Sequence, residues 1–225
     1  MKQTGIMLAM LALFMSPRTL ALAGDTTVQP VKTSVNEPAH RPEPAYMRVF
    51  GQSSPPIGYV QFCERLPADC EIIAGSERRV ELTPQRLSDL DRVNRMVNRD
   101  IKPATDWELY GVEEYWTYPD ARKRGDCEDY VLLKRKILIE QGWPQGALLI
   151  TVVRDERKEG HAILTVRSAQ GDFVLDNKND DIRAWHRTPY QFVMRQSYFN
   201  PKVWVSLEET ETNPSAAVAG VRRDR

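Results

Sequence analysis

The chain has 225 residues, of which 41% are hydrophobic and 28% are charged. This composition suits one globular domain with tails and gives no sign of two separate cores. Basic and acidic residues balance at 31 each, and without the first 23 residues the balance is 29 to 31, a net charge of −2. Nucleic-acid-binding domains carry a basic excess, so this balance argues against a nucleic-acid partner.

The first 23 residues have the three parts of a secretory leader. Lys2 precedes an apolar stretch over residues 6–14, and Ala21-Leu22-Ala23 supplies the small residues of a cleavage site. The apolar stretch is short and Pro17-Arg18 interrupts it, which favours a cleaved leader (residues 1–23) over a membrane-spanning helix. We therefore expect cleavage after Ala23 and export of a soluble mature protein.

Three further segments are predicted from composition. Residues 24–45 are polar, rich in proline and without hydrophobic periodicity, which indicates a flexible linker. Residues 46–207 form the predicted domain, and its first part, residues 46–60, is expected to be irregular structure packed onto the rest. Residues 208–225 are charged and aperiodic, which predicts a disordered tail.

The three cysteines divide into a pair and a single residue. Cys63 and Cys70 are close enough in sequence to close a small disulfide loop in an oxidising compartment. That pairing leaves Cys127 over, and an unpaired cysteine in an exported protein is a candidate reactive thiol. A bridge from Cys127 to one of the other two is the alternative.

Two helices are predicted from start signals and apolar periodicity. The first begins with Thr83 as N-cap and Pro84 at the first helical position, and its apolar stripe ends near Ile101. We interpret this helix as scaffold with a solvated basic face. The second begins after Asp126, an N-cap with Asp129 at the position of a capping-box acid, and ends at Gln141-Gly142.

Cys127 falls in the first turn of the second predicted helix. There the sulfur lies near unpaired backbone N–H groups and the positive end of the helix dipole, which favour thiolate over thiol. The simpler interpretation is a small buried hydrophobic residue, as most free cysteines are. The nucleophile interpretation therefore depends on partner residues elsewhere in the chain.

The remaining pattern predicts an α+β protein in which the cysteine helix precedes a mostly antiparallel sheet. Apolar and β-branched runs predict strands at residues 147–153, 161–166, 173–177, 190–196 and 203–207. Between the two helices, residues 106–119 form an aromatic-rich loop. Its aromatic side chains either cap the core or line a substrate groove.

A base and an orienting group for the thiol come from two of these strands. His161 begins one strand and Asp176 ends the next, and antiparallel neighbours joined by a short turn bring such positions side by side. Asn177 could orient the imidazole instead. Adjacent strand residues face opposite sides, so only one of the two should point at His161, and we favour Asp176.

Three motifs in the chain resemble those of the bacterial transglutaminase-like cysteine proteinases, the group that contains the LapG-type periplasmic proteases. They are Gly125-Asp126-Cys127-Glu128-Asp129-Tyr130, Gly160-His161-Ala162 and Leu175-Asp176-Asn177. The resemblance extends from the predicted disulfide loop to Leu207 and implies a papain-like α+β core. It also implies that Cys127, His161 and Asp176 are nucleophile, base and orienting acid.

The same resemblance implies an oxyanion hole and a metal. The oxyanion would be held by the Cys127 backbone N–H and one upstream group, for which Trp116 is the candidate. LapG-type members depend on calcium bound by acids flanking the cysteine, and here Asp126, Glu128 and Asp129 hold those positions.

There is a physical reason to expect a cation beside the thiol. Three carboxylates should raise the pKa of a neighbouring thiol, and a hard cation bound through oxygens would cancel their field. The alternative is structural: Asp126 caps the helix while Glu128 and Asp129 complement its dipole. A later acidic cluster, Asn179-Asp180-Asp181, is interpreted as a turn.

The sequence thus predicts an exported cysteine endopeptidase with a Cys-His-Asp triad. By resemblance, its location would be the periplasm, its substrate an exported or surface protein such as an adhesin cut near its membrane-retained end, and its regulator an inner-membrane receptor. A transglutaminase or peptidoglycan amidase with the same triad is one alternative. A binding module of the same fold with an unused triad is the other.

Overall fold

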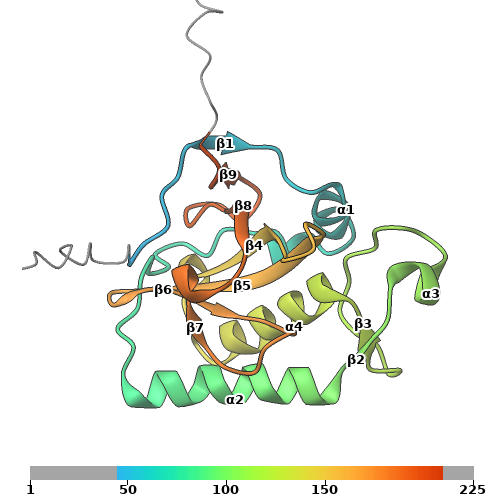
Figure 1. Cartoon of the computed structure of the whole chain (residues 1–225), viewed down its shortest axis with the longest axis horizontal. Coiled ribbons are helices and arrows are strands. Elements are labelled where there is room, and N and C mark those ends of the chain that lie inside the picture. Colours follow the sequence, from blue (N-terminus) through green and yellow to red (C-terminus); the bar gives the residue numbers. More distant parts are fainter. Residues whose placement is uncertain (1–44, 210–225) are drawn as a thin grey trace, which may run out of the picture. The chain divides into compact units, whose positions relative to one another are not determined.

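The computed structural model describes residues 45–209 (Figure 1). The predicted leader, nearly all of the predicted linker and nearly all of the predicted tail lie outside these residues. Within the described range, no helix has the length and apolar character needed to cross a membrane.

The core of the fold is a seven-stranded sheet in the order β1-β9-β8-β4-β5-β6-β7, with every neighbouring pair antiparallel. The strands are β1 (Gly51–Ser53), β4 (Leu148–Arg154), β5 (Gly160–Ser168), β6 (Gly171–Leu175), β7 (Arg183–Ala184), β8 (Gln191–Gln196) and β9 (Trp204–Ser206). The two central strands, β4 and β5, are buried along most of their length, as expected for strands covered on both faces. The predicted α+β class with a mostly antiparallel sheet is confirmed.

Two helices cover one face of this sheet. α4 (Cys127–Glu140) lies between the sheet and α2 (Pro84–Asp100), as Figure 1 shows. The main core cluster joins apolar residues of both helices to the sheet, among them Leu90, Leu138 and Leu164. Burial of such side chains supplies most of the folding free energy, about 25 cal/mol per Å² of apolar area.

The opposite face of the sheet carries a smaller apolar cluster. Val153, Ile163, Val174 and Phe192 pack there with Met47, which comes from the start of the described chain. The segment before β1 is thus held over this face, and the carbonyl of its first described residue, Ala45, accepts a hydrogen bond from the Asp172 N–H (2.8 Å).

The prediction of irregular structure over residues 46–60 was wrong. This region contains β1 and the start of α1 (Ile57–Arg65). The consecutive prolines Pro55 and Pro56 indicated a turn and not the start of a helix. The part of α1 within residues 46–60 is only about one turn long, too short for apolar periodicity to be recognised. Gly58 lies where the Trp116 indole leaves no room for a Cβ atom, so α1 can approach that ring closely.

Part of the predicted aromatic loop is also helical. α3 (Asp106–Tyr110) begins with a capping box, in which the Thr105 hydroxyl accepts from the Glu108 N–H and the Glu108 carboxylate accepts from the Thr105 N–H. Its left-handed C-cap residue is Gly111, with φ of 71°. Two short strands that the sequence did not predict, β2 (Lys102–Pro103) and β3 (Arg124–Gly125), pair in parallel before α4.

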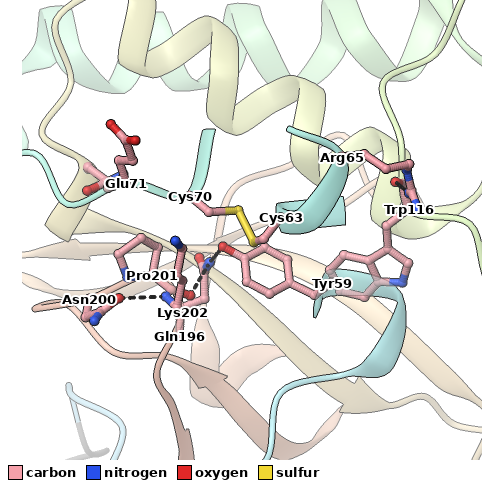
Figure 2. Close-up of a disulfide and its surroundings, with 11 residues drawn as sticks. Tyr59, Cys63, Arg65, Cys70, Glu71, Trp116, Gln196, Asn200, Pro201 and Lys202 are labelled. Atoms are coloured by element: carbon pink, nitrogen blue, oxygen red, sulfur yellow. Dashed lines mark hydrogen bonds between the residues drawn. A yellow bond between two sulfur atoms is a disulfide. The ribbon is translucent and has the colours of Figure 1, made fainter. Parts of the chain in front are cut away.

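The predicted disulfide is confirmed: Cys63 at the end of α1 is bonded to Cys70 in a 3-10 turn, η1 (Pro67–Cys70), with Cα atoms 5.6 Å apart (Figure 2). Beside it, the Tyr59 hydroxyl accepts a hydrogen bond from the Gln196 amide (2.7 Å), which ties α1 to β8 (Figure 2). Cys127 is a free cysteine, so the alternative bridges do not form.

Candidate active site

Cys127 is the first residue of α4, as the sequence predicts. Gly125, two residues before Cys127, is buried, and a Cβ atom there would lie 2.8 Å from the Asp129 Cβ, so only glycine fits at this position. Asp126 takes the N-cap position, but its side chain makes no capping hydrogen bond, and the expected capping box is not formed. Instead its carboxylate lies near those of Asp106 and Asp129.

The Cys127 sulfur has two hydrogen-bond partners. The thiol donates to Glu128 Oε2 at 3.0 Å, and the backbone N–H of Ala162 on β5 donates to the sulfur at 3.4 Å. Burial, followed by the neighbouring Glu128 carboxylate, raises the pKa of Cys127 well above its ordinary value. In this arrangement the thiol form is favoured, because these effects outweigh the helix dipole.

His161 and Asp176 are directly hydrogen-bonded, with 2.9 Å between Nε2 and Oδ1. His161 is the second residue of β5, next to the Ala162 that contacts the sulfur, and Asp176 follows the last residue of β6. Both side chains are buried. The imidazole bonds Asp176 and not Asn177, whose Oδ1 has no hydrogen-bond partner among the described residues.

Sequence analysis missed a tyrosine that completes this pair. The Tyr190 hydroxyl donates to the second carboxylate oxygen of Asp176 at 2.5 Å, and its ring meets the imidazole of His161 edge-on, with centroids 5.5 Å apart. Burial by itself would raise the pKa of Asp176, but the hydrogen bonds from His161 and Tyr190 outweigh it and hold that pKa below its ordinary value. Asp176 is therefore a carboxylate with both oxygens bonded.

The loop that carries Asp176 is held by α2. Asn98 donates from Nδ2 to the Asp176 carbonyl (2.9 Å) and to Asp180 Oδ1 (2.8 Å), and Asn94 donates to the Asp180 carbonyl (3.0 Å). Arg95 adds a salt bridge to Asp181 of 2.9 Å. On the basic face of α2 that was interpreted as solvated, Arg95 thus reaches this loop, whereas Arg92 and Arg99 are exposed.

Three carboxylates form a cluster in front of α4. Asp106, Asp126 and Asp129 each offer an oxygen, and these oxygens lie within 4.8 Å of one another. In each residue one buried carboxylate oxygen has no hydrogen-bond partner in the part of the chain that the structure describes. The expected set was Asp126, Glu128 and Asp129, but Glu128 bonds the Cys127 thiol, and Asp106 of α3 takes the third place.

The electrostatics of this cluster favour a bound cation. Burial, followed by the charge of Glu128, raises the pKa of Asp126 to about 8, and burial raises the pKa of Asp129 to about 8 and that of Glu128 to about 7. A hard divalent cation such as calcium prefers carboxylate oxygens and would stabilise their charged forms. The three unpartnered oxygens fit calcium, whose remaining ligands would be backbone oxygens or waters.

Trp116, the candidate for the oxyanion hole, has its indole N–H engaged elsewhere. That N–H donates to Glu114 (3.0 Å), and the Trp116 carbonyl accepts from Arg65 (2.7 Å), a residue that Figure 2 draws beside it. The ring is buried edge-on against Tyr59. Within the aromatic segment, Trp116 therefore caps the core, whereas Trp107 is 67% exposed.

The chain belongs to the bacterial transglutaminase-like cysteine proteinase (BTLCP) family, whose model matches residues 49–212. The family is one of cysteine peptidases, so a thiol-dependent hydrolase is the class of enzyme that this fold and free cysteine define. No curated protein matches the chain significantly.

Similar solved structures include LapG from Legionella pneumophila. Its calcium-bound form is 25% identical, with 59% of this chain and 75% of that chain covered and a TM-score of 0.47. Its EGTA-treated form is 24% identical, with 62% and 76% covered and a TM-score of 0.47. A third LapG structure is 25% identical, with 56% and 69% covered and a TM-score of 0.45.

Proposed function

We propose that the chain is an exported cysteine endopeptidase in which Cys127 is the nucleophile, His161 the base and Asp176 the group that orients the imidazole. One observation carries this proposal: His161 is hydrogen-bonded to Asp176, and the next residue on β5, Ala162, contacts the Cys127 sulfur through its backbone N–H. The proposed thiol, imidazole and carboxylate come from α4, from β5 and from the end of β6, and nucleophilic catalysis requires that they meet.

The hydrogen bond to Asp176 assigns the two imidazole nitrogens. Because Nε2 of His161 is bonded to the carboxylate, Nδ1 is the nitrogen that takes the thiol proton. The thiolate then attacks the peptide carbonyl carbon, and the imidazolium returns the proton to the departing amine. Water, deprotonated by His161, releases the acyl group from sulfur and restores the thiol.

Two groups on α4 control the first step. The thiol is bonded to Glu128, so this bond has to be replaced before His161 can accept the proton. The Cys127 backbone N–H is among the first four of the helix, which have no intrahelical partner, and is available to the oxyanion. Substrate binding that displaces the Glu128 side chain would therefore activate the thiol.

We further propose that Asp106, Asp126 and Asp129 hold calcium. Their unpartnered buried oxygens support this set. When bound, the ion offsets the carboxylate charge beside Cys127 and so lowers the pKa of the thiol.

The proposed location is the periplasm, with a protein substrate exported from the same cell. The leader pattern of residues 1–23 supports export, and the Cys63–Cys70 disulfide suits an oxidising compartment. The proposed substrate is a surface adhesin cut near its membrane-retained end, with an inner-membrane receptor as regulator.

The test is a comparison of exported proteins in cells that carry the native chain and cells that carry Cys127→Ala. We expect one exported protein to accumulate uncut in the variant, and purified native enzyme, but not the variant, to cut it in vitro. Circular dichroism checks that the variant folds. Unchanged cleavage by Cys127→Ala would refute the proposal, and incorporation of a labelled amine in place of cleavage would indicate a transglutaminase.

Calcium is tested separately. Proteolysis should stop in a chelator and return with calcium but not with magnesium, and Asp106→Asn should weaken the response to calcium. Full activity in chelator would remove the metal from the proposal and leave the triad intact.

A further inference from the structure

Three arginines gather on the sheet face opposite α4. Arg167 follows Val166 on β5, and Arg195 follows Met194 on β8; both preceding residues pack in the core cluster with α4, so the arginines point the other way. Arg79 lies in the segment before α2 and forms a salt bridge with Asp172 on β6. Asp172 is the cross-strand neighbour of Arg167, so Arg79 lies on the same face of the sheet.

The only acid that the structure shows bonded within this arginine cluster (Arg79, Arg167 and Arg195) is Asp172, and its oxygens are taken. Asp172 Oδ1 accepts from Arg79 at 2.9 Å, and Oδ2 accepts from the Met47 N–H at 3.0 Å. Among the described residues, neither Arg167 nor Arg195 has a salt bridge. Three guanidinium groups therefore face one carboxylate.

The two sheet arginines are buried with donors unused. Arg195 is 2% exposed, and its Nε and Nη1 have no hydrogen-bond partner anywhere in residues 45–209. Arg167 is 7% exposed; its Nη1 donates to the Arg78 carbonyl at 2.9 Å, and its Nε has no described partner. The Tyr198 ring covers the Arg167 guanidinium at 4.2 Å.

Physical chemistry requires something to compensate this charge. Burial, followed by the charges of Arg195 and Arg79, lowers the pKa of Arg167 to about 10, and burial lowers the pKa of Arg195. Both remain protonated at neutral pH, and a buried charge without a partner is strongly unfavourable. An anion with several acceptor oxygens would satisfy the unused donors and the excess charge together.

We propose that the arginine cluster of Arg79, Arg167 and Arg195 binds a small oxyanion, a carboxylate or a phosphate. Guanidinium groups match the planar geometry of both ligands. The bound anion would join β8, β5 and the segment that carries Arg79, and through Asp172 it would strengthen the attachment of Met47 over the sheet. This site shares no residue with the proposed triad or the acidic cluster, so it does not depend on the proposed function.

The test is thermal unfolding of the full chain at neutral pH in phosphate, in acetate and in chloride, at equal ionic strength and with a chelator throughout so that calcium does not vary. We expect phosphate or acetate to raise Tm saturably by about 5 °C above chloride. The more effective anion identifies the ligand class. Equal Tm values in all three salts would show that the donors are merely hydrated and would overturn the proposal.

A variant and a matched control locate the effect. Arg195→Met should abolish the anion response and be at least as stable as the native chain in chloride, because it removes an uncompensated charge. Arg154→Met removes a partly exposed arginine of the neighbouring strand β4, which is paired with Glu208, and this variant should respond as the native chain does. A full response in Arg195→Met would place binding elsewhere. Should that variant not fold, calorimetric titration of the native chain decides: one phosphate or acetate per chain supports the site, and no binding refutes it.

Discussion

The Asp176 carboxylate has three hydrogen-bond donors: His161 and the Lys178 N–H at Oδ1, and Tyr190 at Oδ2. Tyr190 therefore holds the carboxylate oxygen that His161 does not bond. A hydrogen bond to a charged group contributes about 1.5–3 kcal/mol. Tyr190 is therefore a positioning residue for His161, the proposed base.

We predict that Tyr190→Phe lowers kcat about tenfold and leaves KM unchanged. Losing the hydroxyl raises the pKa of Asp176, so the acid limb of the pH–rate profile should move to higher pH. Turnover and the rate of Cys127 alkylation by iodoacetamide, each measured against pH, report the change. Tyr46→Phe is the control, since its hydroxyl bonds only the distant Ala169 carbonyl. An unaltered pH–rate profile would mean that Tyr190 contributes only packing contacts and does not position Asp176.

At this scale, sequence patterns singled out the proposed catalytic residues but not the residues that contact them. Cys127, His161 and Asp176 lie in short motifs with recognisable neighbours, whereas Tyr190 is a tyrosine in a strand like many others. Asp106 had a local signal, the Thr-Asp-Trp-Glu capping box, but that signal predicts a helix start and not a carboxylate cluster. These roles arise only when distant segments meet in the fold.

Among the elements, α2 does more than cover α4. The side-chain amides of Asn94 and Asn98 donate to the loop after β6. Asn94 bonds the carbonyls of Asn179 and Asp180, and Asn98 bonds the Asp176 carbonyl and Asp180 Oδ1. Asp176 begins that loop and is not itself in a strand. Its position therefore depends on a helix that lies nearly eighty residues earlier in the chain.

We predict that Asn98→Ala lowers the free energy of unfolding by about 1–3 kcal/mol, because it removes the hydrogen bonds to the Asp176 carbonyl and to Asp180 Oδ1, each worth about 0.5–1.5 kcal/mol. Cys127 alkylation should slow as well, since Asp176 is less firmly placed. Denaturant unfolding and alkylation rates measure the two effects. Arg99→Ala, which removes an exposed side chain paired with Asp100, serves as control. Native stability in Asn98→Ala would contradict the assigned role of α2.

Long periodic elements were predictable and short ones were not. α4, β4 and β5 repeat apolar residues over enough turns or alternations to be recognised, and their ends agree with prediction within two residues. α1 and α3 are stabilised by contacts with Trp116 and by a capping box, respectively, which periodicity does not record. β6 ends at Leu175, two residues before the end of the strand predicted at residues 173–177.

For the molecule as a whole, we predict that stability in the absence of calcium falls as pH rises from about 4 to about 8. The folded chain binds protons at Asp126, Asp129 and Glu128 up to pKa values of about 8, 8 and 7, whereas the unfolded chain releases them near pH 4. Folding is therefore favoured at low pH, and this contribution is lost as pH passes the folded pKa values.

Saturating calcium should reverse this trend, because it binds the deprotonated carboxylates. At 100 times its dissociation constant, the ion adds about 2.7 kcal/mol to the free energy of unfolding. Denaturant unfolding at several pH values, with calcium or with chelator, measures both effects, and magnesium is the control. Stability that rises with pH in chelator would contradict the prediction.

The disulfide should also contribute at the level of the whole molecule. Its seven-residue separation predicts a loss of about 2–3 kcal/mol when Cys63→Ser and Cys70→Ser are combined, chiefly because the unfolded chain regains freedom. Urea midpoints of the double variant and the native chain give the difference. The variant should keep one titratable thiol, that of Cys127, and an unchanged midpoint would show that the bridge adds no stability.

The same spacing governs how the chain would oxidise in an oxidising compartment. Closing a loop costs more entropy as it lengthens, about 0.6 kcal/mol for each doubling, so Cys63 meets Cys70 far more often than either meets Cys127. Once the nearby pair has reacted, the third sulfur has no partner within its own chain. A short bridge formed early thus keeps Cys127, the proposed nucleophile, out of a wrong pairing.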